Sequence, residues 1–494
     1  MTLHHIHNTL FWILLVCFIA TTSTILFFTF GYRFSFERGI FVYTGSVTIK
    51  SNPRDVNIFV DGEPFPNSRV SNVNRTLHLT GLRPGNHHIR VETPGYRTWE
   101  KKVTIRSGIS TEFWNIVLPR ESYERTDLLT GGLLEAFFSP RERRFAVAAE
   151  DDDMTRILVL DRSSLETTEV FASQDVSFDR ESTENIEWSP DGDKLLVPLR
   201  DTDGTRIVYV IDLRTDEAVD WSAEGALSEL RDARWDPTDN RAFFALSEGR
   251  LLRIVPEERR ATERIRVLRE RVRAYDLSGR SIYTIESGAD SVFRATLGGR
   301  KLDPEPLPTA IPHVAGFTAP KISVYDEKRI AVYDEGGNGY LINDDGGLEP
   351  ELLPLGTGIR GVQFSDDGKK LLFYTTNEIS VAFTRDWDMQ PYRASGDIIQ
   401  IARFSTPIFQ PKWSRDYEHI LFAEAGEIRM AELDRRDRRN IVTVDSFGEN
   451  RKIIQLLPDF GENHIYTLTQ EIDDSQGALL SFIEFPEPLG LFGQ

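Results

Sequence analysis

Two acid-rich segments are the residues of this chain whose types and spacing come nearest to a metal site. Glu150-Asp151-Asp152-Asp153 forms one run, and Asp334 to Gly339 with Asn343-Asp344-Asp345-Gly346-Gly347 forms the other. Calcium takes about six to eight oxygen ligands from carboxylates and carbonyls. Neither segment has the D-x-[DN]-x-[DN]-G spacing of an EF-hand loop, and Gly/Asp-rich turns between strands have the same composition. Turns are the simpler interpretation, calcium is the alternative, and no residue is assigned as a metal ligand.

The motifs of common catalytic sites are missing from the sequence. It contains no G-x-S-x-G, no H-E-x-x-H, no Cys/His zinc cluster and no phosphate-binding glycine loop. Of the nine histidines, His4, His5 and His7 lie in the N-terminal tail, where a disordered tail is the simpler interpretation than a metal site. We therefore expect no enzyme, no catalytic residue and no cofactor. The alternative is a carbohydrate-active propeller with paired carboxylates at its central channel, which needs a close Asp/Glu pair and exposed tryptophans.

A repeated unit organises most of the chain. An aromatic residue is followed by a turn sequence and then by an apolar run of strand length. The clear copies are Phe138-Ser139-Pro140, Trp188-Ser189-Pro190-Asp191-Gly192, Trp235-Asp236-Pro237, Phe364-Ser365-Asp366-Asp367-Gly368 and Trp413-Ser414-Arg415-Asp416. Weaker copies surround Tyr275, Tyr325 and Leu456. A unit that recurs roughly every 40–50 residues is typical of a four-stranded propeller blade, so we predict seven or eight blades.

Each unit predicts a strand, a turn and a second strand, with the aromatic packed between neighbouring blades. The aromatic ends one strand, Pro, Asp and Gly make the turn, and the apolar run is a buried strand, as in Lys370-Leu371-Leu372-Phe373-Tyr374. Because a closed ring removes most exposed edges, we expect segment 121–136 to complete the last blade. Residues 256–273 have a helical composition, but alternation over 264–268 favours a charged loop followed by a strand.

The Trp-Ser-Pro-Asp-Gly core resembles the repeat of TolB-like and WD-repeat-like propellers, over about residues 130–485. The resemblance implies the fold and no particular function, because propellers host binding, scaffolding and catalysis.

An apolar segment precedes these repeats. Residues 10–30 read LFWILLVCFIATTSTILFFTF, with no charge, and about 20 apolar residues span a bilayer. The run is longer than the apolar part of a cleaved signal peptide and ends at a poor cleavage site, so we predict an uncleaved anchor. Arg33 and Arg38 follow it, which by the positive-inside rule alone favours a cytoplasmic C-terminus. Cys17, the one cysteine, lies in this run, so the folded domains contain no disulfide.

Residues 43–120 alternate with period two between turn signals such as Asp61-Gly62, which predicts six or seven short strands in a small β-sandwich. Ser51-Asn52-Pro53-Arg54-Asp55-Val56, Leu82-Arg83-Pro84-Gly85-Asn86-His87 and Pro94-Gly95-Tyr96 resemble the PEGA domain, although its eponymous tetrapeptide reads Pro53-Arg54-Asp55-Val56 here. The resemblance implies a surface sandwich of exported or membrane-anchored bacterial proteins, and it favours domains outside the cytoplasm.

Charge is unevenly distributed along the chain. Residues 43–120 hold 11 basic and 6 acidic residues, whereas the whole chain has a net charge of −19. An acidic propeller repels phosphates, so we expect no nucleic-acid partner. The basic residues of the sandwich suggest either contact with anionic headgroups or wall polymers, or an ordinary solvated strand face. They include Arg83, Arg90, Arg97, Lys101, Lys102 and Arg106.

The sequence therefore predicts an all-β protein with an N-terminal tail (1–9), a transmembrane anchor (10–30) that contacts the lipid bilayer, a PEGA-like β-sandwich (43–120) and a β-propeller (121–494). We expect a single-pass, extracytoplasmic binding or scaffold protein. Its propeller faces a protein or polysaccharide of the cell envelope, whose identity the sequence does not give.

Overall fold

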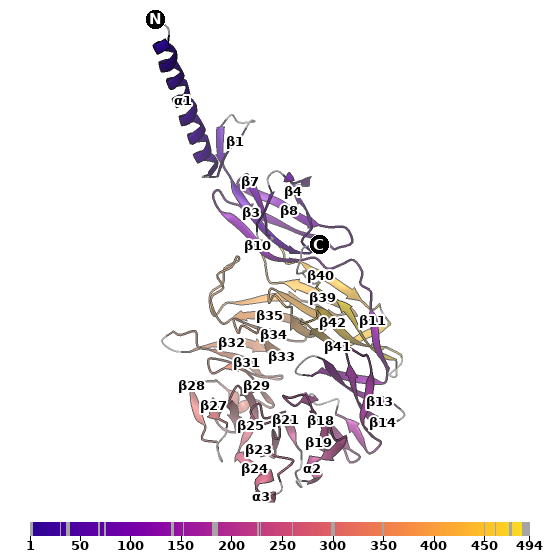
Figure 1. Cartoon of the computed structure of the whole chain (residues 1–494). Helices are drawn as coiled ribbons and strands as arrows, with labels where there is room; N and C mark the ends of the chain where they lie inside the picture. Colours follow the sequence, from indigo (N-terminus) through magenta and orange to yellow (C-terminus); the bar gives the residue numbers. More distant parts are fainter. Residues whose placement is uncertain are drawn as a thin grey trace.

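The structure, a computed structural model, places an N-terminal helix, a small sandwich and a ring of sheets one after another (Figure 1). It describes residues 3–29, 31–35, 40–67, 70–73, 76–139, 143–151, 153–179, 186–224, 227, 229–258, 260–297, 302–347, 350–448, 450–459, 461–473 and 477–486. Pro140 and Asp152 of the predicted motifs lie outside these residues.

Helix α1 (Leu3–Thr29) is one helix of 27 residues, about 40 Å long. Its segment Leu10–Phe27 is apolar and long enough to cross a membrane, and none of that segment is buried in the protein. The hydroxyls of Thr21, Thr24 and Thr29 donate to carbonyls four residues earlier, at 2.7–2.8 Å, as expected of polar side chains in an apolar helix. The prediction of a disordered tail over residues 1–9 is wrong from Leu3 onward, because α1 already begins there.

A hairpin of β1 (Tyr32–Ser35) and β2 (Ile40–Tyr43) joins the helix to the sandwich, with the rings of Tyr32 and Tyr43 stacked at 4.8 Å. The sandwich has two four-stranded sheets. One contains β10 (Ser110–Val117), β3 (Gly45–Asn52), β7 (Thr76–Leu82) and β6 (Val70–Val73), in that order. The other contains β5 (Glu63–Pro64), β4 (Asn57–Val60), β8 (Gly85–Glu92) and β9 (Trp99–Ile105).

Apolar side chains from both sheets, among them Ile49, Leu79 and Ile89, are fully buried between them. The predicted Asp61-Gly62 turn links β4 to β5, and both residues have positive φ (54° and 87°), as a tight hairpin turn requires. The predicted β-sandwich is confirmed.

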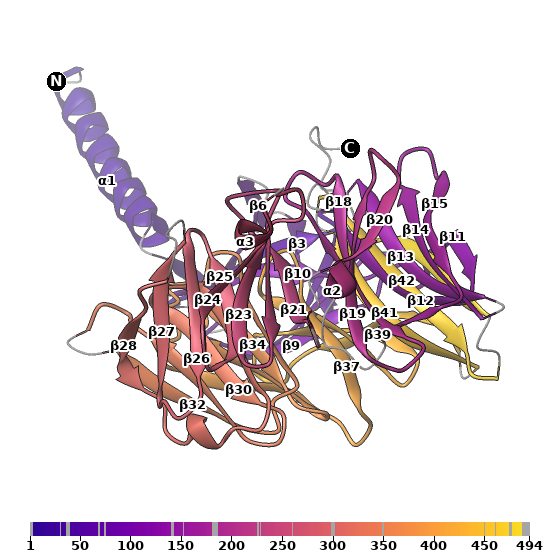
Figure 2. The same cartoon turned by 90° about the horizontal axis from the view of Figure 1, so that it is seen from below.

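The remaining described residues form eight sheets that follow one another around a ring, numbered here 1 to 8 (Figures 1 and 2). The strands of each sheet are given from the innermost outward. Sheet 1 contains β12 (Leu133–Phe138), β13 (Arg144–Asp151), β14 (Met154–Asp161) and β15 (Thr167–Ser173), and sheet 2 contains β16 (Val176–Phe178) with β17 (Glu187–Trp188), then β18 (Lys194–Asp201), β19 (Arg206–Asp212) and β20 (Glu217–Asp220). Sheet 3 contains β21 (Arg231–Trp235), β22 (Phe243–Ser247), β23 (Arg250–Ile254) and β24 (Ile265–Arg269), and sheet 4 contains β25 (Val272–Ser278), β26 (Ser281–Glu286), β27 (Ser291–Thr296) and β28 (Glu305–Ala310).

Sheet 5 contains β29 (Pro320–Asp326), β30 (Arg329–Asp334), β31 (Asn338–Asn343) and β32 (Glu351–Thr357), and sheet 6 contains β33 (Gly361–Phe364), β34 (Lys370–Tyr374), β35 (Glu378–Phe383) and β36 (Ile398–Arg403). Sheet 7 contains β37 (Ile408–Trp413), β38 (His419–Glu424), β39 (Glu427–Glu432) and β40 (Ile441–Ser446), and sheet 8 contains β41 (Arg451–Asp459), β42 (His464–Glu471), β43 (Ala478–Glu484) and β11 (Thr126–Gly131). Short helical turns, α2 (Trp221–Glu224), α3 (Ala261–Arg264) and the 3-10 turn Val314–Gly316, lie in connections. The expected loop and strand over 256–273 are therefore α3 followed by β24.

Strand β11 closes the ring. It comes from the start of the propeller but pairs antiparallel with β43, the last strand of the chain, so segment 121–136 completes the final sheet as predicted. Each aromatic-turn unit forms the first hairpin of its sheet. In sheet 2, Trp188 ends β17, Gly192 has φ of 80°, and the hydroxyl of Ser189 accepts from the Lys194 amide at 2.9 Å.

Tryptophans of the repeat connect three of the sheets to the one before. The indole N–H of Trp188 donates to the Phe137 carbonyl at 3.1 Å, and that of Trp413 donates to the Gln363 carbonyl at 3.0 Å. In both cases the acceptor directly precedes the aromatic residue of the previous sheet. These aromatic residues therefore pack between blades, as predicted, and also donate a hydrogen bond to the main chain of the previous blade.

Side chains of the innermost strands reach in the other direction. The side-chain oxygen of one sheet accepts a hydrogen bond from a main-chain N–H of the next sheet's innermost strand. These bonds run from Trp235 to Glu187 (3.1 Å), Val324 to Asp276 (2.7 Å), Trp413 to Gln363 (3.3 Å), Leu456 to Gln410 (2.8 Å) and Ala136 to Gln455 (2.8 Å). The last of them joins sheet 8 to sheet 1 and so adds to ring closure.

A basic residue at the start of the second strand makes a further link between neighbours. Arg329 donates to the Gly368 carbonyl at 2.9 Å, and Lys370 donates to the Tyr417 carbonyl at 2.7 Å. Both acceptors lie in the turn of the next sheet. The basic residue follows the aromatic by four positions (Tyr325 to Arg329) or six (Phe364 to Lys370), so it is part of the repeat.

The ring-closing bond predicts a measurable loss of stability. Gln455→Leu removes the acceptor of the buried Ala136 amide, which we expect to cost about 1–3 kcal/mol and to lower the melting temperature of the full-length protein in detergent. Gln400→Leu, at an exposed position of β36, is the matched control. Equal melting temperatures for the two variants in scanning calorimetry would contradict this role.

Candidate functional site

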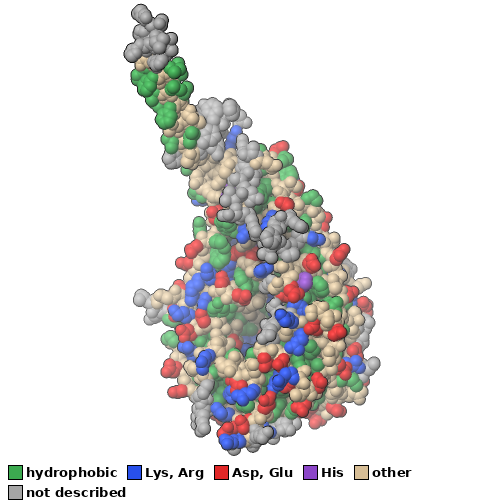
Figure 3. Space-filling view, viewed as in Figure 1, with side chains coloured by type: hydrophobic (Ala, Val, Ile, Leu, Met, Phe, Trp, Pro, Cys, Tyr) green, Lys and Arg blue, Asp and Glu red, His purple; other side chains and the backbone are tan. Residues whose placement is uncertain are grey.

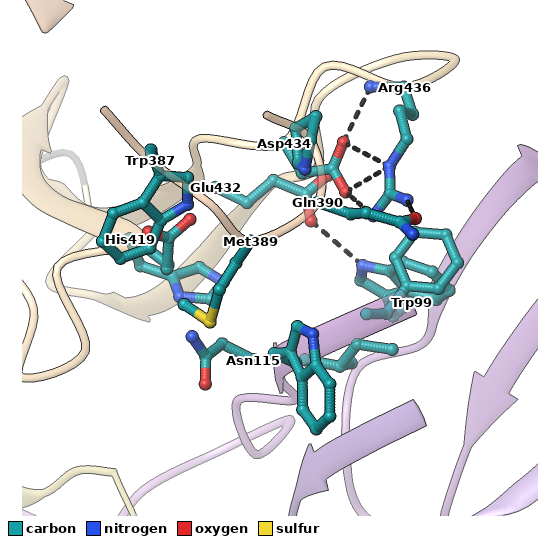
Figure 4. A pocket seen from close by; sticks show the side chains of 14 residues that line it. Trp99, Asn115, Trp387, Met389, Gln390, His419, Glu432, Asp434 and Arg436 are labelled. Atoms are coloured by element: carbon teal, nitrogen blue, oxygen red, sulfur yellow. Dashed lines mark hydrogen bonds and ion pairs between the residues drawn. The ribbon is translucent and has the colours of Figure 1, made fainter. Parts of the chain in front are cut away.

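The sandwich and the ring meet in a joint made by β9, β10 and two propeller loops, 384–397 and 433–440 (Figure 4). Lys101 lies at its centre. The alternation of β9 places Lys101 on the same face as Trp99 and Val103, where a lysine is unusual, and its side chain is fully buried. Its ammonium is surrounded by oxygens from sheet 7: the carbonyls of Asp434 (2.9 Å), Arg436 (3.1 Å) and Arg438 (2.8 Å), and a carboxylate oxygen of Glu432 (2.6 Å).

Glu432 is the matching anion. Besides Lys101, its carboxylate accepts from the indole N–H of Trp99 at 3.0 Å and from the main-chain amide of Asn440 at 2.8 Å. Its side chain is 8% exposed. A buried pair is tolerated only when its charges and remaining hydrogen-bonding atoms find partners, and this one meets that condition.

The same loops cap the free edge of the sandwich. Strand β10 is an edge strand, and edge main-chain groups need partners. Gln390 accepts from the Glu112 amide at 3.1 Å and donates to the Ser110 carbonyl at 3.0 Å. Arg436 donates to the Glu112 carbonyl at 2.7 Å and lies over the Phe113 ring at 4.1 Å. The propeller thus satisfies the edge as a neighbouring strand would.

The space next to Trp99 in the joint is small. The cavity between Trp99, Trp387 and His419 has a volume of about 40 Å³, enough for a few water molecules but not for an organic ligand (Figure 4). This part of the joint therefore fixes the sandwich to the propeller.

His419 lies under this joint and is 3% exposed. Its Nδ1 is 2.7 Å from Asp416. Burial opposes the charged ring, but Asp416, and after it Glu432 and Glu418, outweigh burial and raise the pKa of His419. The charged form of this histidine therefore contributes stability beneath the interface.

A second cavity lies among the innermost strands β12, β17, β37 and β41, with a volume of about 410 Å³. Its lining includes Glu187, Gln410, Lys412 and Gln455. Burial raises the pKa of Glu187 to about 7, although Arg234 and the Trp235 amide favour the charged form. Burial also lowers the pKa of Lys412. This cavity is large enough for a small molecule, and the face of the ring in Figure 3 is hollowed near its centre.

The two acid-rich segments place carboxylates against main-chain amides. Asp334 accepts from the amides of Thr318 and Ala319, and Asp344 and Asp345 accept from those of Gly346 and Gly347. In the first segment, Asp151 accepts from Gly132. These bonds support the turn interpretation.

Within the described part of the chain, one other cluster has metal-ligand chemistry, namely Asp459, Glu462 and His464. The guanidinium of Arg162 contacts both carboxylates, at 2.5 and 2.6 Å, so a protein cation already lies between them.

Lys101 is the residue that sequence reasoning misjudged. Both interpretations of the basic sandwich residues, polymer contact or a solvated face, are wrong for Lys101, because it is buried against the propeller. The alternation of β9 places Lys101 on the buried face, and this pattern could have predicted its burial from the sequence. Loop 433–440 and Gln390 gave no comparable signal, because their contacts to the sandwich connect residues about 280 to 340 positions apart.

Residues 44–121 match the PEGA domain. No curated protein matches the chain. Among solved structures, the Dos1 propeller is 9% identical (TM-score 0.47; 75% of this chain, 96% of that one), and the Cps50 (Swd1) β-propeller domain of Myceliophteria thermophila is 11% identical (0.42; 73% and 99%). The dihydro-heme d1 dehydrogenase NirN is 14% identical (0.44; 70% and 75%). These likenesses concern the fold alone, and a propeller with a PEGA domain fits a binding or scaffold role.

The joint predicts a large effect of removing its cation. Lys101→Met leaves Glu432 buried without a counter-charge, so we expect a loss of about 3–5 kcal/mol and a clearly lower melting temperature. Lys102→Met is the control, because Lys102 is exposed and contributes its main-chain amide to Asp437. If both variants melt alike, Lys101 does not hold the joint. Adding Glu432→Gln to Lys101→Met should recover part of the loss.

His419 predicts a pH-dependent effect. A histidine whose pKa is raised by folding stabilises the protein fully below its unfolded pKa, about 6.5, and loses that effect as the pH rises through the folded value. The melting deficit of His419→Gln should therefore be larger at pH 6 than at pH 9. Burial lowers the pKa of His464, so His464→Gln should show the opposite trend. A deficit for His419→Gln that is the same at all pH values would refute the charged-ring account.

Proposed function

We propose that this protein is a membrane-anchored scaffold that holds its propeller outside the cytoplasm, on a rigid stalk, for a protein or polysaccharide of the cell envelope. The observation that carries the proposal is the joint of Lys101, Glu432 and the capped β10 edge. A flexible tether needs no buried ion pair between its parts. A protein that must present a surface in one orientation gains from such a joint.

The anchor supports the same function. The side chains of Leu10, Phe11, Trp12 and Leu14 are each more than half exposed, and a lipid bilayer is the environment that buries them. Hydrophobic side chains gather along this helix in Figure 3. The sandwich follows the helix after the short β1–β2 hairpin, and the propeller follows the sandwich, so the chain order matches anchor, stalk and presented domain.

The alternative of a carbohydrate-active enzyme gains no comparable support. The repeat tryptophans Trp188, Trp235 and Trp413 are 1–8% exposed, because they pack between sheets. The exposed tryptophans that the alternative requires at the channel are therefore not these. Asp276, near Glu187, is held by Arg234 at 2.6 Å.

Protease accessibility on intact cells tests the proposed orientation. With an epitope at the C-terminus, we expect added protease to digest the propeller on intact cells or, for a double-membrane envelope, after the outer membrane is opened. A cytoplasmic protein in the same cells must stay intact until lysis. Protection of the propeller until lysis would reverse the orientation and exclude an envelope partner.

A further inference from the structure

The cavity among strands β12, β17, β37 and β41 lies where the two ends of the propeller meet. Its walls come from sheets 7, 8, 1 and 2, on either side of the closure between Gln455 and Ala136. At about 410 Å³ it is ten times larger than the cavity of the joint and can hold a molecule the size of a monosaccharide. It shares no lining residue with the cavity of the joint. Ligand binding to it can therefore be tested separately from the proposed orientation in the membrane.

Lys412 is the charged group of this cavity without a partner. It lies on β37 between the buried residues Pro411 and Trp413. In the part of the chain that the structure describes, no hydrogen bond or ion pair reaches its ammonium, and burial is the sole cause of its lowered pKa. A partly buried ammonium without a counter-charge is costly. An anion beside it would offset that cost.

The glutamines of the wall add donors. The Oε1 atoms of Gln410 and Gln455 already accept from the amides of Leu456 and Ala136. Those bonds fix the orientation of each side-chain amide, so its NH₂ group is the part left to bind a ligand. Both groups are donors only, which again favours a ligand rich in acceptor oxygens.

Glu187 completes the polar wall. One carboxyl oxygen accepts from the Trp235 amide, and because its pKa is about 7, the group is protonated below neutral pH and then donates. The charged groups that act on it are Arg234, Asp232 and Asp276. At pH 6 the cavity therefore offers a cation and neutral donors.

We propose that this cavity binds a small oxyanion, with its carboxylate or phosphate against Lys412 and its other oxygens against the amides of Gln410 and Gln455. The favoured ligand is a sugar acid or a similar molecule with one negative charge and several hydroxyls. Phe137 and Trp188 add apolar surface to the wall of the same cavity.

Calorimetric titration of the full-length protein in detergent at pH 6 tests the site. The probes are glucuronate, its neutral counterpart glucose, and inorganic phosphate. We expect glucuronate to bind about tenfold or more tightly than glucose. Phosphate binding with equal affinity would identify a general oxyanion site, and weaker phosphate binding would identify a sugar-acid site. Binding of neither anion, or equal binding of glucuronate and glucose, would overturn the proposal.

Variants separate this site from nonspecific attraction. Lys412→Met should weaken glucuronate binding about tenfold or more, and Lys412→Arg should retain most of it. Lys452→Met, at an exposed position of the neighbouring strand β41, is the matched control and should bind as the parent does. Lys412→Gln serves if the methionine variant does not fold. Unchanged binding in both uncharged variants, or an equal loss in the control, would overturn the role of Lys412.

Discussion

The structure of the propeller depends on how the free edge of each innermost strand is satisfied. Such a strand has a neighbour on one side only, and its other main-chain groups face the centre of the ring. At two junctions a tryptophan of the next sheet donates twice to one residue of the sheet before it. Its main-chain amide donates to the side chain of Glu187 or Gln363, and its indole donates to the main-chain carbonyl of the same residue. Both bonds run in the same direction, from the later sheet to the earlier one. The ring therefore needs polar side chains at its centre, where burial alone would favour apolar ones.

The joint uses the same solution on a different edge. Strand β10 has unpaired main-chain groups, and Gln390 and Arg436 supply the partners. Lys101 acts in the opposite direction, from the sandwich to the propeller, because its ammonium donates to three main-chain carbonyls of loop 433–440. In both places a side chain completes the main-chain hydrogen bonding of a neighbour. Because main-chain positions are fixed by the folds on either side, such bonds define orientation more strictly than contacts between two flexible side chains.

Local patterns predicted the parts of the structure that depend on local chemistry. The unit at Trp188 placed a strand end, a turn and a buried strand correctly, because all three follow from neighbouring residues. The closure by β11 followed from the general need to pair edges. The environment of Lys101 could not be predicted, because its four oxygens come from residues more than 330 positions away. The cavity beside Lys412 needs four sheets in place, which no single segment specifies.

Strand β11 also sets the order of events in biosynthesis. Thr126 pairs with Phe482, so the ribosome must add about 350 residues after β11 before its partner exists. At roughly 5–20 residues per second this takes on the order of 20 to 70 seconds. Throughout that time the emerging sheets form an open arc with unpaired ends. The arc can become a circle only when synthesis is nearly complete, which makes the newly made chain a natural client of chaperones that shield exposed strands.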